Sequence, residues 1–142
     1  MQNLIYALIQ VIHNFGAATV VGASATALWL LRGNEGLVRG AAPVQRRLAV
    51  IVATAWAVQA ASGMLFGITT YWFERHLPDI HGVAVDALLI KAVCAAAGFI
   101  LAIAHARPDS GRAGDRWILV WRVSLGLGLV ALGSAAFLRW FS

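Results

Sequence analysis

Four long apolar segments dominate the chain, and each is long enough to cross a lipid bilayer. They run over about 4–31, 48–73, 82–106 and 117–141. A spanning helix needs ~20 mostly apolar residues to cross a hydrocarbon core about 30 Å thick. None of the segments alternates polar and apolar residues, as the strands of a membrane β-barrel do. Because a helix satisfies its own backbone hydrogen bonds in lipid, we expect four membrane-spanning α-helices.

The composition excludes most classes of water-soluble protein. Hydrophobic residues make up 61% of the 142 residues and charged residues 12%, which is about half the charged fraction of a soluble domain. One cysteine excludes a disulfide framework and a cysteine zinc cluster. The net charge of +5 is not gathered in a basic patch with exposed aromatic residues, so we expect no nucleic-acid partner. The sequence predicts one all-α integral membrane domain over 1–142, an antiparallel four-helix bundle whose partner is the lipid bilayer.

The arginines between the segments predict how the chain is oriented. Connections 32–47 and 107–116 lie on one side of a four-span chain, and connection 74–81 lies on the other. Seven arginines fall in the first two connections and one in the third. Because connections rich in lysine and arginine stay in the cytoplasm, we expect both termini and connection 74–81 on the outer, periplasmic side. The membrane is then the bacterial inner (cytoplasmic) membrane.

Tryptophan and proline positions agree with these boundaries. Tryptophan gathers at the bilayer interface, and all tryptophans except Trp56 lie near expected helix ends: Trp29, Trp72, Trp117, Trp121 and Trp140. The prolines, Pro43, Pro78 and Pro108, are expected in the connections, so no span needs a proline kink.

The third segment carries two ionisable residues on one stripe. Lys91, Ala95, Gly98, Ala102 and His105 are spaced by 4, 3, 4 and 3 residues, which places them on one face of a helix. Small residues let helices approach closely in lipid, so this face is expected to point into the bundle. Lys91 and His105 are then about 21 Å apart, too far for one metal ion to bind both.

Four candidate ligands are expected in the outer half of the bundle. His13 and Lys91 each lie nine residues from the outer end of their segment, about 13–15 Å deep. Met64 lies at a similar level, and Cys94 about one turn deeper. An ionisable residue in a span indicates function because placing it there costs several kcal/mol. An amine that has lost its proton can also ligate a metal.

Structural alternatives exist for these residues. Lys91 could pair with Asp86, about 140° round the helix, or extend its stem to the interface. His13 could be a core histidine bonded to a carbonyl. Met64 and Cys94 are soft sulfur ligands that suit Cu(I), but single residues of these types more often only pack.

The inner half holds a second candidate cofactor group, His105 with Arg122. There Arg122 would face an anionic group such as a haem propionate. The alternative is a solvated helix end, which we favour for Arg122. His76 and His81, in connection 74–81, are expected to be solvated, with metal uptake as the alternative.

The first three segments resemble two related groups of small bacterial membrane proteins. The residues that carry the resemblance are His13 with Ala27–Leu31, Arg46-Arg47-Leu48, Ala61-Ser62-Gly63, Leu88–Lys91 and Ala104–Arg107. This pattern resembles the copper-resistance D (CopD-like) membrane domain and, more distantly, the HemJ-type protoporphyrinogen oxidases. The latter have a first-span histidine and a third-span lysine implicated in haem binding, which correspond to His13 and Lys91. They also have an aromatic, proline- and arginine-containing stretch ending in histidine where this chain has Leu30–Asn34. What carries over is His13 and Lys91 as a cofactor pair, and no more.

Three functions from different classes follow. We rank first an electron-transfer protein that holds b-type haem in the outer half and exchanges electrons with a quinone or a larger membrane protein. The second is a non-catalytic subunit of a respiratory or photosynthetic complex, which explains the small residues but explains Lys91 badly. The third is a copper-handling transporter with His13, Met64 and Cys94 along its path. No motif of a hydrolase or of a nucleotide-binding loop is present.

Overall fold

Four long helices form the described part of the chain. The computed structural model describes residues 1–32, 42–76, 81–107 and 115–140. The helices are α1 (Gln2–Leu31), α3 (Ala42–Glu74), α4 (Val83–Ala106) and α5 (Asp115–Trp140). Each contains a stretch long and apolar enough to cross a membrane, and the described ranges contain no strand. The prediction of an all-helical chain with four such helices is confirmed.

The second helix begins earlier than the apolar segment from which it was predicted. α3 starts at Ala42 rather than at 48, so Pro43 lies in its first turn. The prediction that Pro43 lies in a connection was therefore wrong. Proline is tolerated there because the first backbone N–H groups of a helix have no intrahelical acceptor. Pro78 and Pro108 lie outside the described residues.

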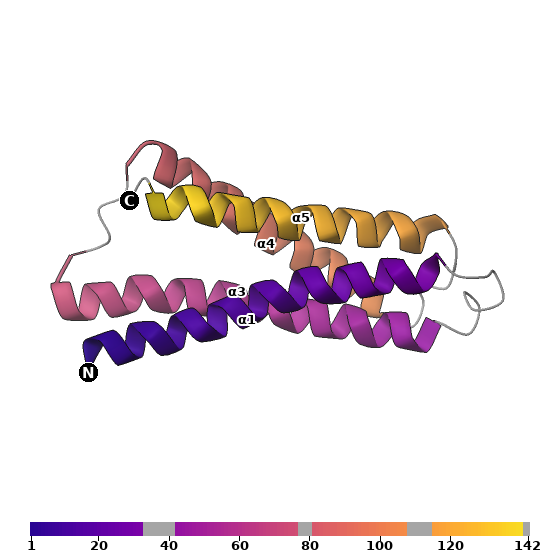
Figure 1. Cartoon of the computed structure of the whole chain (residues 1–142), viewed down its shortest axis with the longest axis horizontal. Helices are drawn as coiled ribbons and strands as arrows, with labels where there is room; N and C mark the ends of the chain where they lie inside the picture. Colours follow the sequence, from indigo (N-terminus) through magenta and orange to yellow (C-terminus); the bar gives the residue numbers. More distant parts are fainter. Residues whose placement is uncertain (33–41, 77–80, 108–114, 141–142) are drawn as a thin grey trace.

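The helices run antiparallel. The start of α1, the end of α3, the start of α4 and the end of α5 lie at one end of the bundle (Figure 1). His13 and Lys91 are in the half nearer this end, which we call the outer half. His105 is in the other half, which we call the inner half. This arrangement agrees with the predicted order of spans, and the orientation across a membrane stays a prediction.

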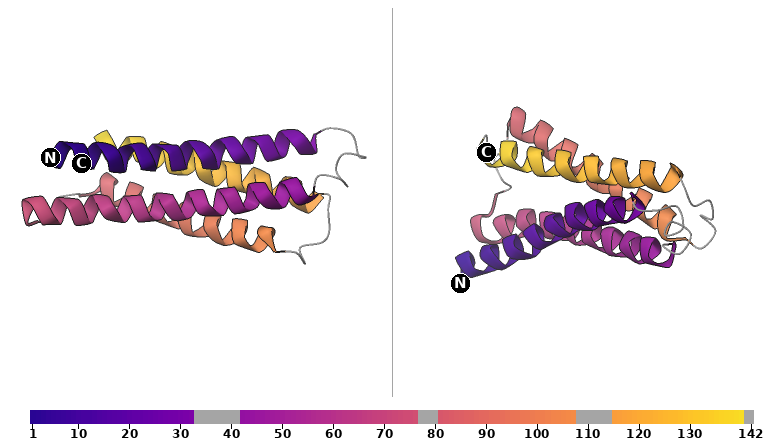
Figure 2. Two further views of the ribbon diagram at one scale, coloured as in Figure 1. Left: turned by 90° about the horizontal axis from the view of Figure 1, so that it is seen from below. Right: turned by 45° about the vertical axis from the view of Figure 1, so that its right-hand side comes forward.

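Each helix packs against two of the other three. α1 contacts α3 and α5, and α4 contacts the same two helices. The backbones of α1 and α4 make no contact with each other, so these two helices stand diagonally across the bundle. Figure 2 shows the same arrangement from two further sides. A side chain that joins α1 to α4 must therefore cross the bundle centre.

Large apolar side chains cover much of the outside of the bundle. Phe15, Met64 and Ile100 are each about two-thirds exposed or more, at 71%, 65% and 66%. In water such a surface would be costly, whereas lipid tails solvate it at no cost. This exterior is what a membrane-embedded bundle needs.

Two tryptophans that were expected at the membrane interface lie inside the bundle instead. Trp29, Trp72 and Trp140 are 67–82% exposed, whereas Trp117 and Trp121 are 3% and 1% exposed. The interfacial prediction was wrong for these two. Trp117 and Trp121 are spaced by four residues and share one face of α5. Nearness to a helix end predicts the depth of a side chain, but not the side of the helix it occupies.

Trp56 fills the centre of the bundle against a glycine of α4. Its side chain is 3% exposed, and a Cβ atom built on Gly98 would overlap its indole ring. Gly98 lies seven residues from both Lys91 and His105 on α4. The contact therefore lies midway between Lys91 and His105 on α4.

Candidate functional site

His13 points from α1 into the bundle, where its ring meets a serine of α3. The side chain is 8% exposed, and its Nδ1 lies 2.7 Å from Ser62 Oγ. Ser62 lies on the buried side of α3 and is 2% exposed. The imidazole is thus held at one nitrogen, inside the bundle.

The other contacts of Ser62 assign the proton of the imidazole. Ser62 Oγ lies 2.6 Å from the carbonyl oxygen of Val58 and 3.2 Å from that of Gln59. Carbonyl oxygens only accept, so the single hydroxyl proton of Ser62 is donated to them. The Oγ must then accept from His13 Nδ1–H. This leaves the lone pair on Nε2, the nitrogen that faces the bundle centre.

Lys91 reaches His13 from the diagonally opposite helix. Its Nζ lies 2.7 Å from His13 Nε2, and the amine donates because Nε2 carries the lone pair. α1 and α4 have no backbone contact, so the lysine stem crosses the bundle centre. The two side chains thus meet, as their equal predicted depths allow. The alternative pairing of Lys91 with Asp86 is not what the structure shows, since Asp86 is exposed on α4.

Gln59, which the sequence analysis missed, ties α3 to the backbone of α1 beside His13. It is 6% exposed, and its Nε2 donates to the carbonyl oxygen of His13. A Cβ on Gly16 would lie 3.2 Å from Gln59 Cγ. The absence of a side chain at Gly16 therefore leaves space for the Gln59 side chain. Gln59 and Ser62 are polar residues three apart within an apolar segment. That spacing places them on one helix face and was the available signal.

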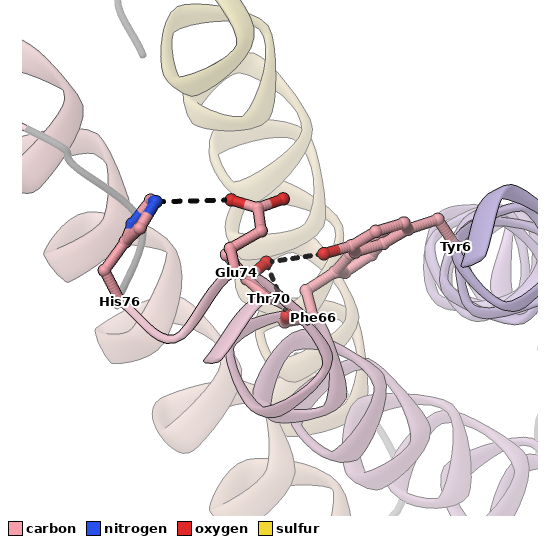
Figure 3. A network of polar contacts seen from close by, with 5 residues as sticks. All are labelled: Tyr6, Phe66, Thr70, Glu74 and His76. Atoms are coloured by element: carbon pink, nitrogen blue, oxygen red, sulfur yellow. Dashed lines mark hydrogen bonds and ion pairs between the residues drawn. The ribbon is translucent and has the colours of Figure 1, made fainter. Parts of the chain in front are cut away.

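A layer of aromatic and hydroxyl groups, Tyr6, Phe66 and Thr70, is drawn in Figure 3. It lies between His13 and the outer end of the bundle. The Phe66 ring is edge-on to His13 at 6.1 Å and stacked with Tyr6 at 6.3 Å between centroids. Thr70 donates to the carbonyl oxygen of Phe66 at 3.0 Å, so Tyr6 donates its hydroxyl proton to Thr70 Oγ1, also at 3.0 Å. These contacts join α1 to α3 at the level above the imidazole.

At the outer end of α3, Figure 3 also shows the pair of Glu74 and His76. The atoms His76 Nε2 and Glu74 Oε2 are 3.7 Å apart, and the two side chains are 65% and 42% exposed. His81 is exposed as well. These groups lie at the surface, as expected for solvated residues.

The structure does not bring His105 and Arg122 into contact, as the alternative favoured for Arg122 requires. The His105 ring lies edge-on to Trp117 at 4.2 Å and to Trp121 at 6.4 Å between centroids. Arg122 is exposed, because it follows Trp121 and so lies about 100° round α5 from that buried face. His105 therefore lies beside two tryptophans, and Arg122 is exposed, as expected for a helix-end residue.

The three predicted copper ligands are not brought together either. Cys94 is 5% exposed, as His13 is 8%, whereas Met64 is 65% exposed and faces outward from α3. Within the described ranges, no group of three or more histidine, cysteine, aspartate or glutamate residues is placed to hold a metal ion. The site around His13 therefore consists of one imidazole, one amine, a hydroxyl and an amide.

Comparison of the chain with protein-family models, with curated proteins and with solved structures finds no match. The resemblance to the CopD-like and HemJ-type families thus stays an expectation from short motifs.

Proposed function

We propose that the chain is a membrane-embedded redox protein that holds a b-type haem through His13. The observation that carries this proposal is the state of the His13 ring. Nδ1 donates to Ser62, and the lone pair of Nε2 faces the centre of a bundle of apolar helices. Metal-binding histidines are oriented in this way, by a hydrogen bond from the nitrogen that does not bind the metal.

The residues of the site fit a haem ligand set. An imidazole nitrogen is a common ligand of haem iron, and His13 Nε2 would supply it. Lys91 now occupies this lone pair at 2.7 Å, and one lone pair cannot serve an amine and a metal at once. Lys91 would therefore give up its hydrogen bond on haem binding and become the second group that holds the haem. Its flexible four-carbon stem allows this.

The chain's own groups would orient the ligand and keep water away. A bound haem supplies one-electron transfer. Ser62 holds the imidazole ring, Gln59 fixes the α1 backbone at His13, and Phe66 and Tyr6 cover the outer side. Because the site lies deep among apolar helices, the electron partner is proposed to be a quinone or another membrane protein.

Copper handling and a purely structural subunit receive less support. The copper hypothesis needs Met64 beside His13, and Met64 lies at the surface. The subunit hypothesis needs no ligand, and it gives no reason for a lysine that crosses the bundle to a buried histidine.

The proposal is tested by the absorption spectrum of the purified protein, oxidised and reduced, together with its haem and copper content. We expect a Soret band, reduced-minus-oxidised bands of a b-type haem, and no copper. Stoichiometric copper without haem would favour the transporter. If the protein is expressed with an adequate supply of haem and contains neither haem nor copper, the result would favour the structural subunit.

We also propose that the bundle lies in the bacterial inner membrane with both termini outside, supported by the seven arginines in connections 32–47 and 107–116. Single cysteines at Asp79 and Gly111 test this with a membrane-impermeant thiol reagent applied to intact cells. Both positions lie outside the described residues. Labelling at 79 and not at 111 is expected, and the reverse pattern would invert the orientation.

A further inference from the structure

Two amide side chains of α1 lie on the outside of the bundle. Gln10 and Asn14 are both exposed, and Gln10 Nε2 donates to Asn14 Oδ1 at 2.7 Å. They lie about 60° and 100° round α1 from His13. They are therefore separate from the candidate haem site.

Both amides lie within the hydrocarbon core if α1 crosses a membrane. α1 has 30 residues and is about 45 Å long, so Asn14 and Gln10 lie about 4 and 10 Å from its midpoint. The core extends only about 15 Å to each side of the bilayer centre. No water is available there to bond an amide, and an unmet amide in apolar surroundings costs several kcal/mol.

The bond between the two amides leaves hydrogen-bonding capacity unused. Within the described residues, Gln10 Oε1 has no donor and Asn14 Nδ2 has no acceptor. Exchanging nitrogen and oxygen in both amides would leave the mirror arrangement, with one spare carbonyl oxygen and one spare amide group. Each chain thus presents one acceptor and one donor within about one helical turn of each other.

We propose that this face of α1 binds the same face of a second copy of the chain, forming a dimer. A two-fold axis along the membrane normal places the Gln10–Asn14 pairs of the two copies at the same level, so that the spare donor of each copy bonds the spare acceptor of the other in two equivalent hydrogen bonds. The copies insert with the same topology, so their α1 helices run parallel, as this pairing requires. In a two-fold interface the same surface of both copies meets, so this surface must carry both a donor and an acceptor. The Gln10–Asn14 pair supplies one of each.

The neighbouring residues on this face allow the helices to approach. Ala7 and Ala18 are exposed one turn to either side of the amides, at helical spacing from them. Small residues beside polar ones are typical of helix contacts in membranes. Leu8 and Phe15, about 100° round α1 from Ala7 and Asn14, are 55% and 71% exposed and suit contact with lipid.

Cysteine cross-linking in native membranes tests the dimer. Ala7→Cys is compared with Leu8→Cys, which has nearly the same depth but lies off the proposed face, both in a Cys94→Ala background. After mild oxidation we expect a disulfide-linked dimer from Ala7→Cys and little from Leu8→Cys. Equal yields from the two variants, or none from Ala7→Cys, would overturn the proposal.

Replacing the amides tests their part in the contact. Gln10→Leu with Asn14→Leu should lower the cross-linking of Ala7→Cys about tenfold, the change that two interhelical hydrogen bonds support. Leucine favours membrane insertion, so the variant should still fold, which unchanged near-UV circular dichroism would verify. A folded double variant that cross-links as strongly as the parent would contradict the proposal, as would co-purification of a different membrane protein in place of the second copy.

Discussion

The outer and inner halves of the bundle each contain a histidine, and the two are held in different ways. His13 is fixed by hydrogen bonds to groups from two other helices, Ser62 of α3 and Lys91 of α4. His105 packs its ring against Trp117 and Trp121 of α5. At His13, the hydrogen bond from Nδ1 to Ser62 leaves the lone pair of Nε2 directed at the bundle centre. This is the orientation that a metal-binding histidine needs.

The largest expected effect is the loss of haem when the outer histidine is replaced. His13→Gln keeps a polar side chain of similar volume but removes the imidazole ligand, so haem per mole of purified protein should fall below detection. His105→Gln, about 21 Å from Lys91 along α4, should retain a wild-type spectrum. The opposite result would move the site to the inner half.

Replacing the serine that orients His13 should have a smaller effect on haem. Ser62→Ala removes the acceptor of the Nδ1–H group, and loss of such a partner typically weakens metal binding about 10–100-fold. Ser24→Ala is the control, because Ser24 bonds Ser124 at 2.9 Å in the inner half of the bundle. That variant should lose about 1 kcal/mol of stability at unchanged haem affinity. If haem titrations give the same affinity for Ser62→Ala and Ser24→Ala, the role given to Ser62 is contradicted.

The contact between the two halves should be sensitive to a single methyl group. Gly98→Ala places a Cβ on the Trp56 ring, and such overpacking costs about 1–3 kcal/mol. At Gly126 an added Cβ meets nothing within 4 Å, so Gly126→Ala should leave the free energy of unfolding unchanged or slightly raised. Thermal unfolding in detergent measures both. An equal Tm for the two variants would show that the helices part easily at Trp56.

The smallest effect is expected for the stability of Lys91→Met without haem. The variant removes an amine whose burial is costly, and replacing buried charged groups by apolar ones is often neutral or stabilising. We expect the free energy of unfolding to change by less than about 1 kcal/mol. A loss of 3 kcal/mol or more, measured by denaturant titration, would mean that the bond to His13 mainly holds the bundle together.

The sequence predicted the position of a residue along the bundle better than the side of the helix on which it lies. Apolar length gave the four helices, and counting from the helix ends brought His13 and Lys91 together, because the rise per residue is constant. The side of a helix that faces inward depends on how neighbouring helices pack. That is why Trp117 and Trp121 were placed at the interface, and why Met64, which faces outward, was grouped with the candidate ligands of the outer half.

The residues that hydrogen-bond to His13 show the same limit of prediction from the sequence. Ser62 and Gln59 are polar residues in an apolar segment, but their roles depend on α3 lying beside α1. The diagonal position of α4 was not predictable from depth either. It makes Lys91 cross the bundle centre instead of reaching a neighbouring surface.

Rescue of His13→Gly by free imidazole tests most directly whether the His13 ring is the iron ligand. The substitution leaves a space of the size of the ring beside Ser62, which can accept from the added imidazole as it does from His13. The account predicts that haem absent from this variant returns, with a wild-type reduced-minus-oxidised spectrum, when millimolar imidazole is added during reconstitution. Haem binding by His13→Gly without imidazole, or no recovery with it in a variant that is folded, would contradict the account.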